Sequence, residues 1–240
     1  MVSTWSRPTY LAYAWRAIVV ACVLTAWTGG RLHAQGAVTG RVALLERANG
    51  VSRDLMNGVV QLEPLDATRR DRNDALMIAA IDMRAREFVP RVQLVRAGGK
   101  VGFPNSDPFS HNVFSNSALG AFDLGLYRSH VTRTTSFTRP GVYAIYCNIH
   151  ARMVSFVVAV STPYVARVGR DGRFSIAGVP AGSYRVRVWH ERAAEVTQTI
   201  DVPLSGVVDV NVSMDARGYE EKPHPNKFGA PYTATRADRY

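Results

Sequence analysis

Short runs of alternating apolar and polar residues dominate the chain between residues 37 and 214, and this pattern constrains the fold most. The clearest runs are residues 59–62, 142–146, 153–160, 184–189 and 207–212. Glycine and proline separate them, for example at Pro140-Gly141 and Asp171-Gly172. Many short strands with such turn signals are typical of sandwiches and barrels. No helix of convincing length is predicted in this range, so we predict an all-β protein.

The runs fall into two groups along the chain. The strand-turn-strand order restarts after a Ser-Thr-Pro segment at residues 161–163, and we predict a domain boundary there. One domain is therefore expected over residues 35–162 and a smaller one over residues 163–214. The periodic pattern stops beyond them, and residues 215–240 are predicted to be an extended or disordered tail, with docking over a domain as one alternative.

The first 34 residues have the features of a signal peptide. Arg7 and Arg16 supply positive charge, and the apolar run 17–27 is too short to span a bilayer. Small-residue cleavage after Ala34 would start the mature chain at Gln35. We expect an exported protein, with the periplasm as its compartment and no membrane span after cleavage.

Two other interpretations of this segment remain open. An uncleaved anchor would extend back to Leu11, but Arg16 would then lie inside the span. Lipoprotein processing at Cys22 would leave an apolar stretch of only a few residues after Arg16.

The chain has 2 cysteines, Cys22 and Cys147, so a disulfide framework is excluded. Cleavage would remove Cys22 and leave Cys147 as a lone thiol in an oxidising compartment. Such a thiol is open to oxidation unless something holds it, and a metal ion is one way to do so.

The net charge of +10 raises nucleic acid as a partner. No nucleic-acid-binding motif accompanies the charge, and the arginines are spread along strands and loops, so we expect no nucleic-acid binding. Removal of residues 1–34 takes away three arginines and no acid, which leaves a net charge of +7. A basic surface of this kind could steer an acidic redox partner.

The segment at residues 147–153 carries the clearest chemical signal, with Cys147, His150 and Met153 in C-x2-H-x2-M spacing. Thiolate, imidazole and thioether together suit copper better than calcium, magnesium or structural zinc. A second imidazole must come from elsewhere. Among the other histidines, His111 is the best candidate because it begins a predicted strand after a proline-rich turn.

Residues 85–160 resemble the cupredoxins, the blue-copper group of plastocyanin and azurin. The resemblance depends on the ligand loop and on Phe88-x-Pro90, Gly98-Gly99-Lys100-Val101, Phe103-x-Asn105, His111-Asn112-Val113 and Pro140-Gly141-x-Tyr143. The short ligand loop is most similar to those of amicyanin and pseudoazurin. The resemblance implies a Greek-key β-sandwich with one type 1 copper, bound by His111, Cys147, His150 and an axial Met153. It also implies that Asn112 ties the two ligand loops together.

Two parts of the chain depart from this family. Residues 35–87 are longer and more charged than the start of a minimal cupredoxin, so we interpret them as an atypical N-terminal extension of the copper domain. Residues 171–184 resemble carboxypeptidase-regulatory-like modules, which have a prealbumin-like β-sandwich fold and usually carry no catalytic residues. The combination resembles exported plastocyanin-like proteins of the methylamine-utilisation type.

The family resemblance implies an electron carrier rather than an enzyme, and no catalytic motif contradicts it. His150 would be the electron port, and Asn105 and Asn112 would orient the ligands. The expected partner is a transient redox protein such as a c-type cytochrome, or a copper or quinone enzyme. The alternatives are a copper carrier or sensor, and a non-catalytic cell-surface binding module.

Overall fold

The computed structural model describes residues 35–46, 50–52, 55–66 and 77–232. The predicted signal peptide, residues 1–34, lies outside these ranges together with Cys22. Within them every regular element is a strand, which confirms the all-β prediction. None of the described residues forms a helix with the length and apolar character needed to cross a bilayer.

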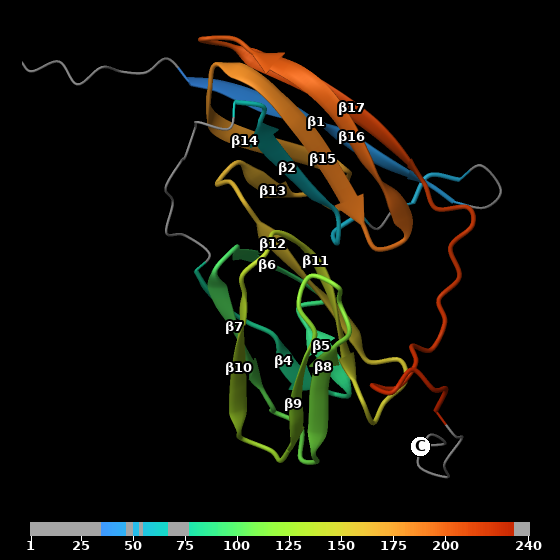
Figure 1. Cartoon of the computed structure of the whole chain (residues 1–240). Helices are drawn as coiled ribbons and strands as arrows, with labels where there is room; N and C mark the ends of the chain where they lie inside the picture. The colour runs from blue at the N-terminus through green and yellow to red at the C-terminus, as the bar shows by residue number, and fades with distance from the viewer. Residues whose placement is uncertain (1–34, 47–49, 53–54, 67–76, 233–240) are drawn as a thin grey trace, which may run out of the picture. The chain divides into compact units, whose positions relative to one another are not determined.

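The metal-site sandwich comprises strands β3 to β12 (Figure 1). Its larger sheet has the order β6 (Val92–Arg96), β12 (Val154–Val160), β11 (Gly141–Cys147), β8 (His111–Ser115) and β9 (Phe122–Tyr127). The facing sheet has the order β10 (Thr132–Phe137), β7 (Gly99–Pro104) and β3 (Ile78–Ala80), and a hairpin joins β4 (Asp82–Arg84) to β5 (Glu87–Val89). Pairing of β8 with β11, while the intervening β10 crosses to the other sheet, is typical of Greek-key sandwiches.

Period-two burial explains the core of this sandwich. In β7 the side chains of Val101 and Phe103 are buried, and in β11 those of Tyr143, Ile145 and Cys147. All five belong to one apolar cluster that joins the two sheets. Cys147 is the last inward-facing residue of β11. Because side chains alternate between the two faces of a strand, its sulfur lies at the end of the core.

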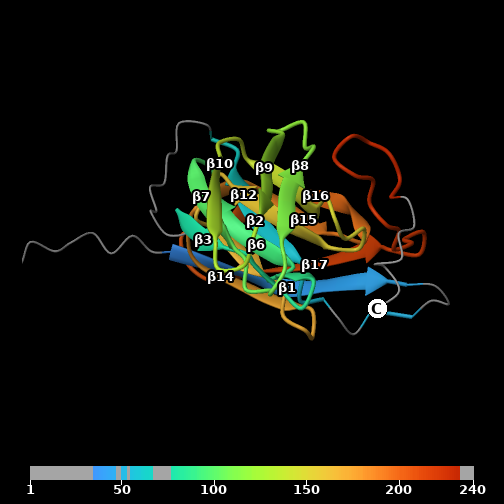
Figure 2. The same cartoon turned by 90° about the horizontal axis from the view of Figure 1, so that it is seen from below.

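The second sandwich contains the remaining strands. One sheet has the order β14 (Arg173–Pro180), β1 (Gln35–Leu45) and β17 (Val207–Asp215), so β1 is central (Figure 2). The other has the order β13 (Val165–Arg167), β2 (Val59–Pro64), β15 (Gly182–His190) and β16 (Ala193–Val202). A separate apolar cluster, with Leu44, Leu62 and Tyr184 fully buried, fills the space between these sheets.

The strand pairing corrects the expected domain boundaries. Residues 35–64 do not extend the metal-site sandwich, because β1 pairs in parallel with β17 and β2 pairs with β13 and β15. The metal-site sandwich is thus inserted between β2 and β13 of the second sandwich. These two strands are hydrogen-bonded neighbours, so the ends of the insertion lie close together. Residues 78–89 form strands β3 to β5 of the metal-site sandwich.

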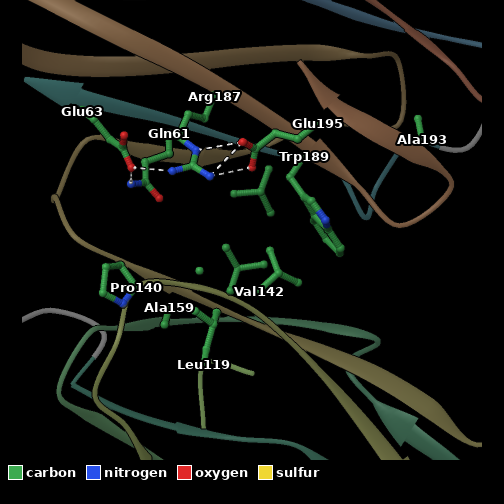
Figure 3. A pocket seen from close by; sticks show the side chains of 13 residues that line it. Gln61, Glu63, Leu119, Pro140, Val142, Ala159, Arg187, Trp189, Ala193 and Glu195 are labelled. Atoms are coloured by element: carbon green, nitrogen blue, oxygen red, sulfur yellow. Dashed lines mark hydrogen bonds and ion pairs between the residues drawn. The ribbon is translucent and has the colours of Figure 1, made fainter. Parts of the chain in front are cut away.

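A third apolar cluster joins the two sandwiches. Val59 of the second sandwich packs there with Val92, Leu94, Val158 and Val160 of the metal-site sandwich. A cavity of 480 Å³ lies beside it, lined by residues that include Trp189 and Val142 (Figure 3). Its charged groups are paired among themselves, because Arg187 bonds both Glu63 and Glu195. We therefore interpret the cavity as a gap in the packing, because its charged side chains are already paired with one another.

Gly40 offers a test of the central position of β1. A Cβ atom there would lie 1.8 Å from the carbonyl oxygen of Val210, and neither backbone can move without breaking the sheet. We expect Gly40→Ala to lower the free energy of unfolding by about 3 kcal/mol in urea denaturation. Gly218→Ala is the control, because nothing lies within 4 Å of its Cβ position. A Gly40→Ala variant as stable as the control would contradict the observed pairing of β1.

Candidate metal centre

Three of the four predicted ligands lie together. The ligand atoms of His111, Cys147 and His150 are all within 4.8 Å of one another, and no other such group occurs among the described His, Cys, Asp and Glu residues. The Cys147 sulfur is 3.6 Å from Nδ1 of His111 and 3.7 Å from Nδ1 of His150. Metal–sulfur and metal–nitrogen bonds of about 2.3 and 2.0 Å at tetrahedral to trigonal angles place these atoms about 3.6 Å apart. The three side chains therefore fit one ion.

Strand register brings the ligands together. β8 pairs antiparallel with β11, with Cys147 opposite Val113, so His111 extends beyond the paired region toward the loop that follows Cys147. That ligand loop, residues 148–153, turns back sharply because the amide of Met153 donates to the carbonyl of His150, at 3.0 Å. The amide of Cys147 in turn donates to the carbonyl of Met153, at 3.2 Å.

The same turn places Met153 in the apolar core of the metal-site sandwich. Its side chain is 2% exposed and belongs to the apolar cluster that contains Cys147. The structure thus places Met153 in the core beside the site. Its predicted role as the axial ligand stays a prediction.

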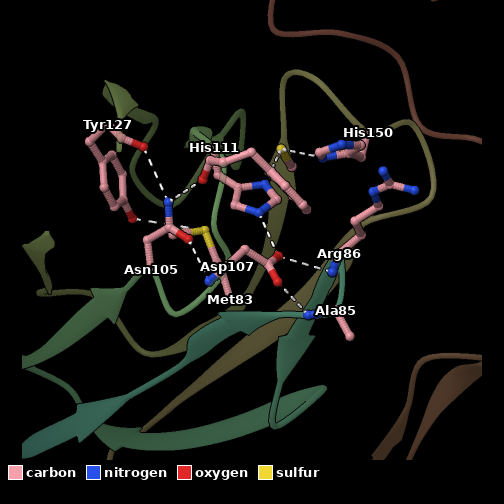
Figure 4. Close-up of polar contacts among 10 residues, drawn as sticks. Met83, Ala85, Arg86, Asn105, Asp107, His111, Tyr127 and His150 are labelled. Carbon is pink, nitrogen blue, oxygen red and sulfur yellow. Dashed lines mark hydrogen bonds and ion pairs between the residues drawn. The ribbon is translucent and has the colours of Figure 1, made fainter. Parts of the chain in front are cut away.

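The sequence analysis missed Asp107, which holds His111. The Oδ2 atom of Asp107 lies 2.7 Å from Nε2 of His111, and both side chains are buried (Figure 4). A carboxylate at this nitrogen fixes the proton on Nε2 and leaves the Nδ1 lone pair directed toward the Cys147 sulfur. The sequence signal was an acidic residue four positions before a predicted ligand, in Asn105-Ser106-Asp107-Pro108.

The β4–β5 turn supplies the other partners of this carboxylate. The backbone amides of Ala85 and Arg86 donate to Asp107 at 2.6 and 3.0 Å. Both turn residues have positive φ angles, 53° and 60°, which point their amides to the same side. Burial by itself would raise the pKa of Asp107, but the amide of Arg86, the ring of His111 and the amide of Ala85 together lower it. Asp107 is therefore ionised when it accepts from His111.

The two predicted supporting asparagines have different contacts. Asn105 donates to the carbonyls of Phe109 and Tyr127 and accepts from the amide of Asp107, so it braces the segment that leads to His111. Asn112 acts through its backbone, because its carbonyl accepts from the amide of Asn148 at 3.1 Å. This bond connects the segment of His111 directly to the ligand loop.

The environment of Cys147 is apolar. Burial raises the pKa of its thiol, while the backbone amides of Asn112, Ile149 and His150 act in the opposite direction. A metal ion would have to displace the thiol proton, so metal binding to this site should release a proton. The ring of Phe109 lies 5.1 Å from that of His111 and 5.9 Å from that of His150 and shields both.

The remaining described histidines lie outside the His111, Cys147 and His150 cluster. His130 is exposed, although its amide donates to Asn105. His190 is buried at the end of β15 in the second sandwich and accepts from the amide of Arg192. His224, which the sequence placed in a disordered or docking tail, is buried against the ligand loop and bonds the His150 carbonyl.

Comparisons with known proteins give partial matches only. No family model matches the chain. No curated protein matches it either. Among solved structures, a purple cupredoxin from Nitrosopumilus maritimus shares 22% identity over 34% of this chain and 99% of its own, with a TM-score of 0.32.

Two further solved structures align with a similar share of the chain. A copper-containing nitrite reductase from Thermus scotoductus SA-01 shares 21% identity over 42% of this chain and 26% of its own, with a TM-score of 0.34. Amicyanin from Paracoccus versutus shares 18% identity over 42% of this chain and 97% of its own, with a TM-score of 0.33. Each alignment covers less than half of this chain.

Replacement of Asp107 by Asn tests its contribution to the site. The carboxylate accepts from the amides of Ala85 and Arg86 and from the ring of His111. An asparagine side chain has a single acceptor oxygen, so at least one of these buried donors would lose its partner. We expect Asp107→Asn to lower the free energy of unfolding of the metal-free protein by about 2 kcal/mol in urea. The exposed Asp209→Asn variant should stay within about 0.5 kcal/mol of the wild type. Equal free energies of unfolding for the two variants would show that the hydrogen bonds of Asp107 do not stabilise the site.

Proposed function

We propose that this chain is an exported carrier of single electrons with one type 1 copper. His111, Cys147 and His150 would form the trigonal ligand set, and Met153 would be the weak axial ligand. The observation that carries the proposal is the pair of imidazole Nδ1 atoms, 3.6 and 3.7 Å from one buried cysteine sulfur. In family terms, the metal-site sandwich would be a cupredoxin and the second sandwich a carboxypeptidase-regulatory-like module.

The donor set favours copper over other metals. Oxygen-preferring ions are disfavoured, because no carboxylate belongs to the ligand cluster and Asp107 faces the far side of His111. Structural zinc sites have four strong ligands, whereas the cluster offers three. Two imidazoles and one thiolate with a buried methionine nearby match the composition of blue-copper sites.

The ligands are held by groups that do not depend on the metal. Asp107 fixes His111, the β11 strand fixes Cys147, and the Met153 amide fixes the turn at His150. A bound copper ion supplies the one-electron change between Cu(I) and Cu(II). Because these ligands are braced from behind, little should move when the charge changes, which favours electron transfer over metal release.

His150 is the proposed electron port. It is half-buried, whereas His111 and Cys147 are fully buried, so among these ligands His150 lies closest to solvent. We infer a transient partner such as a c-type cytochrome, or a copper or quinone enzyme, with the basic charge of the chain assisting its approach. The chain would transfer electrons and catalyse no reaction of its own.

Copper reconstitution tests this proposal. The reduced, metal-free mature protein should bind one equivalent of Cu²⁺ and develop an intense thiolate-to-copper band in the visible range, with a type 1 EPR spectrum. The band should be absent in Cys147→Ser. Wild-type protein that binds Cu²⁺ without this band would refute the type 1 assignment, and ready transfer of Cu(I) to an acceptor would favour a copper carrier.

Met153→Leu tests the axial ligand. We expect copper to remain bound and the reduction potential to rise, because loss of the thioether removes a donor that stabilises Cu(II) relative to an apolar side chain. Met214→Leu is a matched control, since Met214 is fully buried in the core of the second sandwich. Identical potentials and spectra for the two variants would exclude Met153 from the site.

A further inference from the structure

The chain returns to the ligand loop after its last strand. Beyond β17 the described tail forms no strand, yet it runs from the second sandwich to the metal-site sandwich (orange-red trace in Figure 1). The contacts concern residues 223–232, which we call the strap. The sequence analysis predicted an extended or disordered tail here, with docking over a domain as one alternative; residues 223–232 dock on the metal-site sandwich through specific contacts.

The strap makes hydrogen bonds along the ligand loop. The amide of His224 donates to the carbonyl of Ala151 at 3.0 Å, and Nε2 of the same residue lies 3.2 Å from the carbonyl of His150. The hydroxyl of Tyr232 donates to the carbonyl of Cys147 at 2.7 Å. Two of these three carbonyls, those of Cys147 and His150, belong to proposed copper ligands.

A further pair of contacts reaches the other ligand segment. The amide of Lys227 donates to Oδ1 of Asn148 at 2.9 Å, and its ammonium pairs with Asp123 at 2.5 Å. The other oxygen of Asp123 accepts from the side chain of Asn112, the neighbour of His111, at 2.6 Å. The strap therefore contacts the loop of Cys147 and His150 directly and the segment of His111 through Asp123.

Packing of His224 holds the strap in place. The residue is 8% exposed, and its ring centroid lies 4.4 Å from that of Tyr146 with an angle of 30° between the rings. The edges of Phe114 and Tyr232 complete the enclosure at 6.1 and 5.4 Å. A solvated tail would not bury an imidazole among three aromatic rings, so the docking is specific.

A turn inside the strap sets the spacing of its contacts. The side-chain oxygen of Asn226 accepts from the amides of Phe228 and Ala230, and the amide of Asn226 donates to the carbonyl of Ala230. This closed turn reverses the chain between His224 and Tyr232 and returns Tyr232 to the Cys147 carbonyl.

We propose that the strap is a positioning element that holds the ligand loop in its metal-binding conformation and slows its opening, with His224 and Tyr232 as the positioning residues. The proposal rests on the proposed function of the loop as a metal site. Loops that join strands open more readily than the strands themselves, and hydrogen bonds to loop carbonyls oppose that opening. Loss of the strap contacts should therefore release both the loop and any metal it holds.

Two variants separate the hydrogen bonds from the packing. Tyr232→Phe keeps the ring and removes the hydroxyl that bonds Cys147, while His224→Ala removes both the ring and its contact to His150. Phe228→Ala is the control, because Phe228 lies in the strap, is 82% exposed and stacks only with Lys227 among the described contacts. Unfolding in urea verifies that each full-length variant is folded.

The first measurement uses the metal-free protein, so it is independent of copper. Hydrogen exchange is followed at the amides of Cys147, Asn148 and Met153, which are hydrogen-bonded within the site. We expect exchange to be roughly fivefold faster in Tyr232→Phe, in line with the loss of one typical hydrogen bond, and faster still in His224→Ala. Exchange in Phe228→Ala should equal that of the wild type.

The second measurement is the rate at which a chelator removes Cu²⁺ from the loaded protein, and it should increase in the same order. Wild-type exchange rates at these amides in both Tyr232→Phe and His224→Ala would overturn the proposal, whatever the copper result. If wild-type protein bound no Cu²⁺, the proposed function would fail, while the exchange experiment would still report whether the strap holds the loop.

Discussion

The buried hydrogen bond between Asp107 and His111 connects the β4–β5 turn and the Asp107 loop to the start of β8. The carboxylate is held by two backbone amides of the β4–β5 turn, and it in turn fixes the ring at the start of β8. A buried carboxylate is costly unless every oxygen has a donor, so the turn, the Asp107 loop and His111 must form together. The ring orientation that results directs Nδ1 toward Cys147 and makes a shared ion site geometrically available.

The insertion of the metal-site sandwich gives the site a second source of support. The last strand, β17, pairs with β1 in the second sandwich. The chain that follows β17 must therefore run back to the metal-site sandwich to contact the ligand loop. The strap makes that return and bonds the carbonyls of Cys147 and His150. The ligand loop is therefore stabilised by the hydrogen bond of its own turn and by the strap that follows the second sandwich. This bracing accords with a site in which the ligands keep one arrangement.

Local patterns predicted much of this structure, and their failures have a common cause. Period-two alternation, which begins near residue 37, correctly predicted an all-β chain, and residues 35–45 do form a strand. Our interpretation of residues 35–87 as an extension of the copper domain placed this strand in the wrong sandwich, because alternation defines a buried face and carries no information about which strand lies alongside. The parallel partner of β1, at residues 207–215, is far away in sequence. The same limit applies to Asp107, whose chemistry depends on a turn formed some 20 residues earlier in the chain.

Local sequence patterns were enough to predict the strand class of the chain and the types of donor atom at the site. Cys147, His150 and Met153 lie on one short loop, where spacing alone restricts their separation, and His111 stood out as the remaining imidazole at a strand start. The insertion, the carboxylate bonded to His111 and the strap across the ligand loop became visible in the folded structure alone. Each of these depends on hydrogen bonds between segments distant in the sequence, and such pairings are selected by burial and register in the folded chain rather than by local composition.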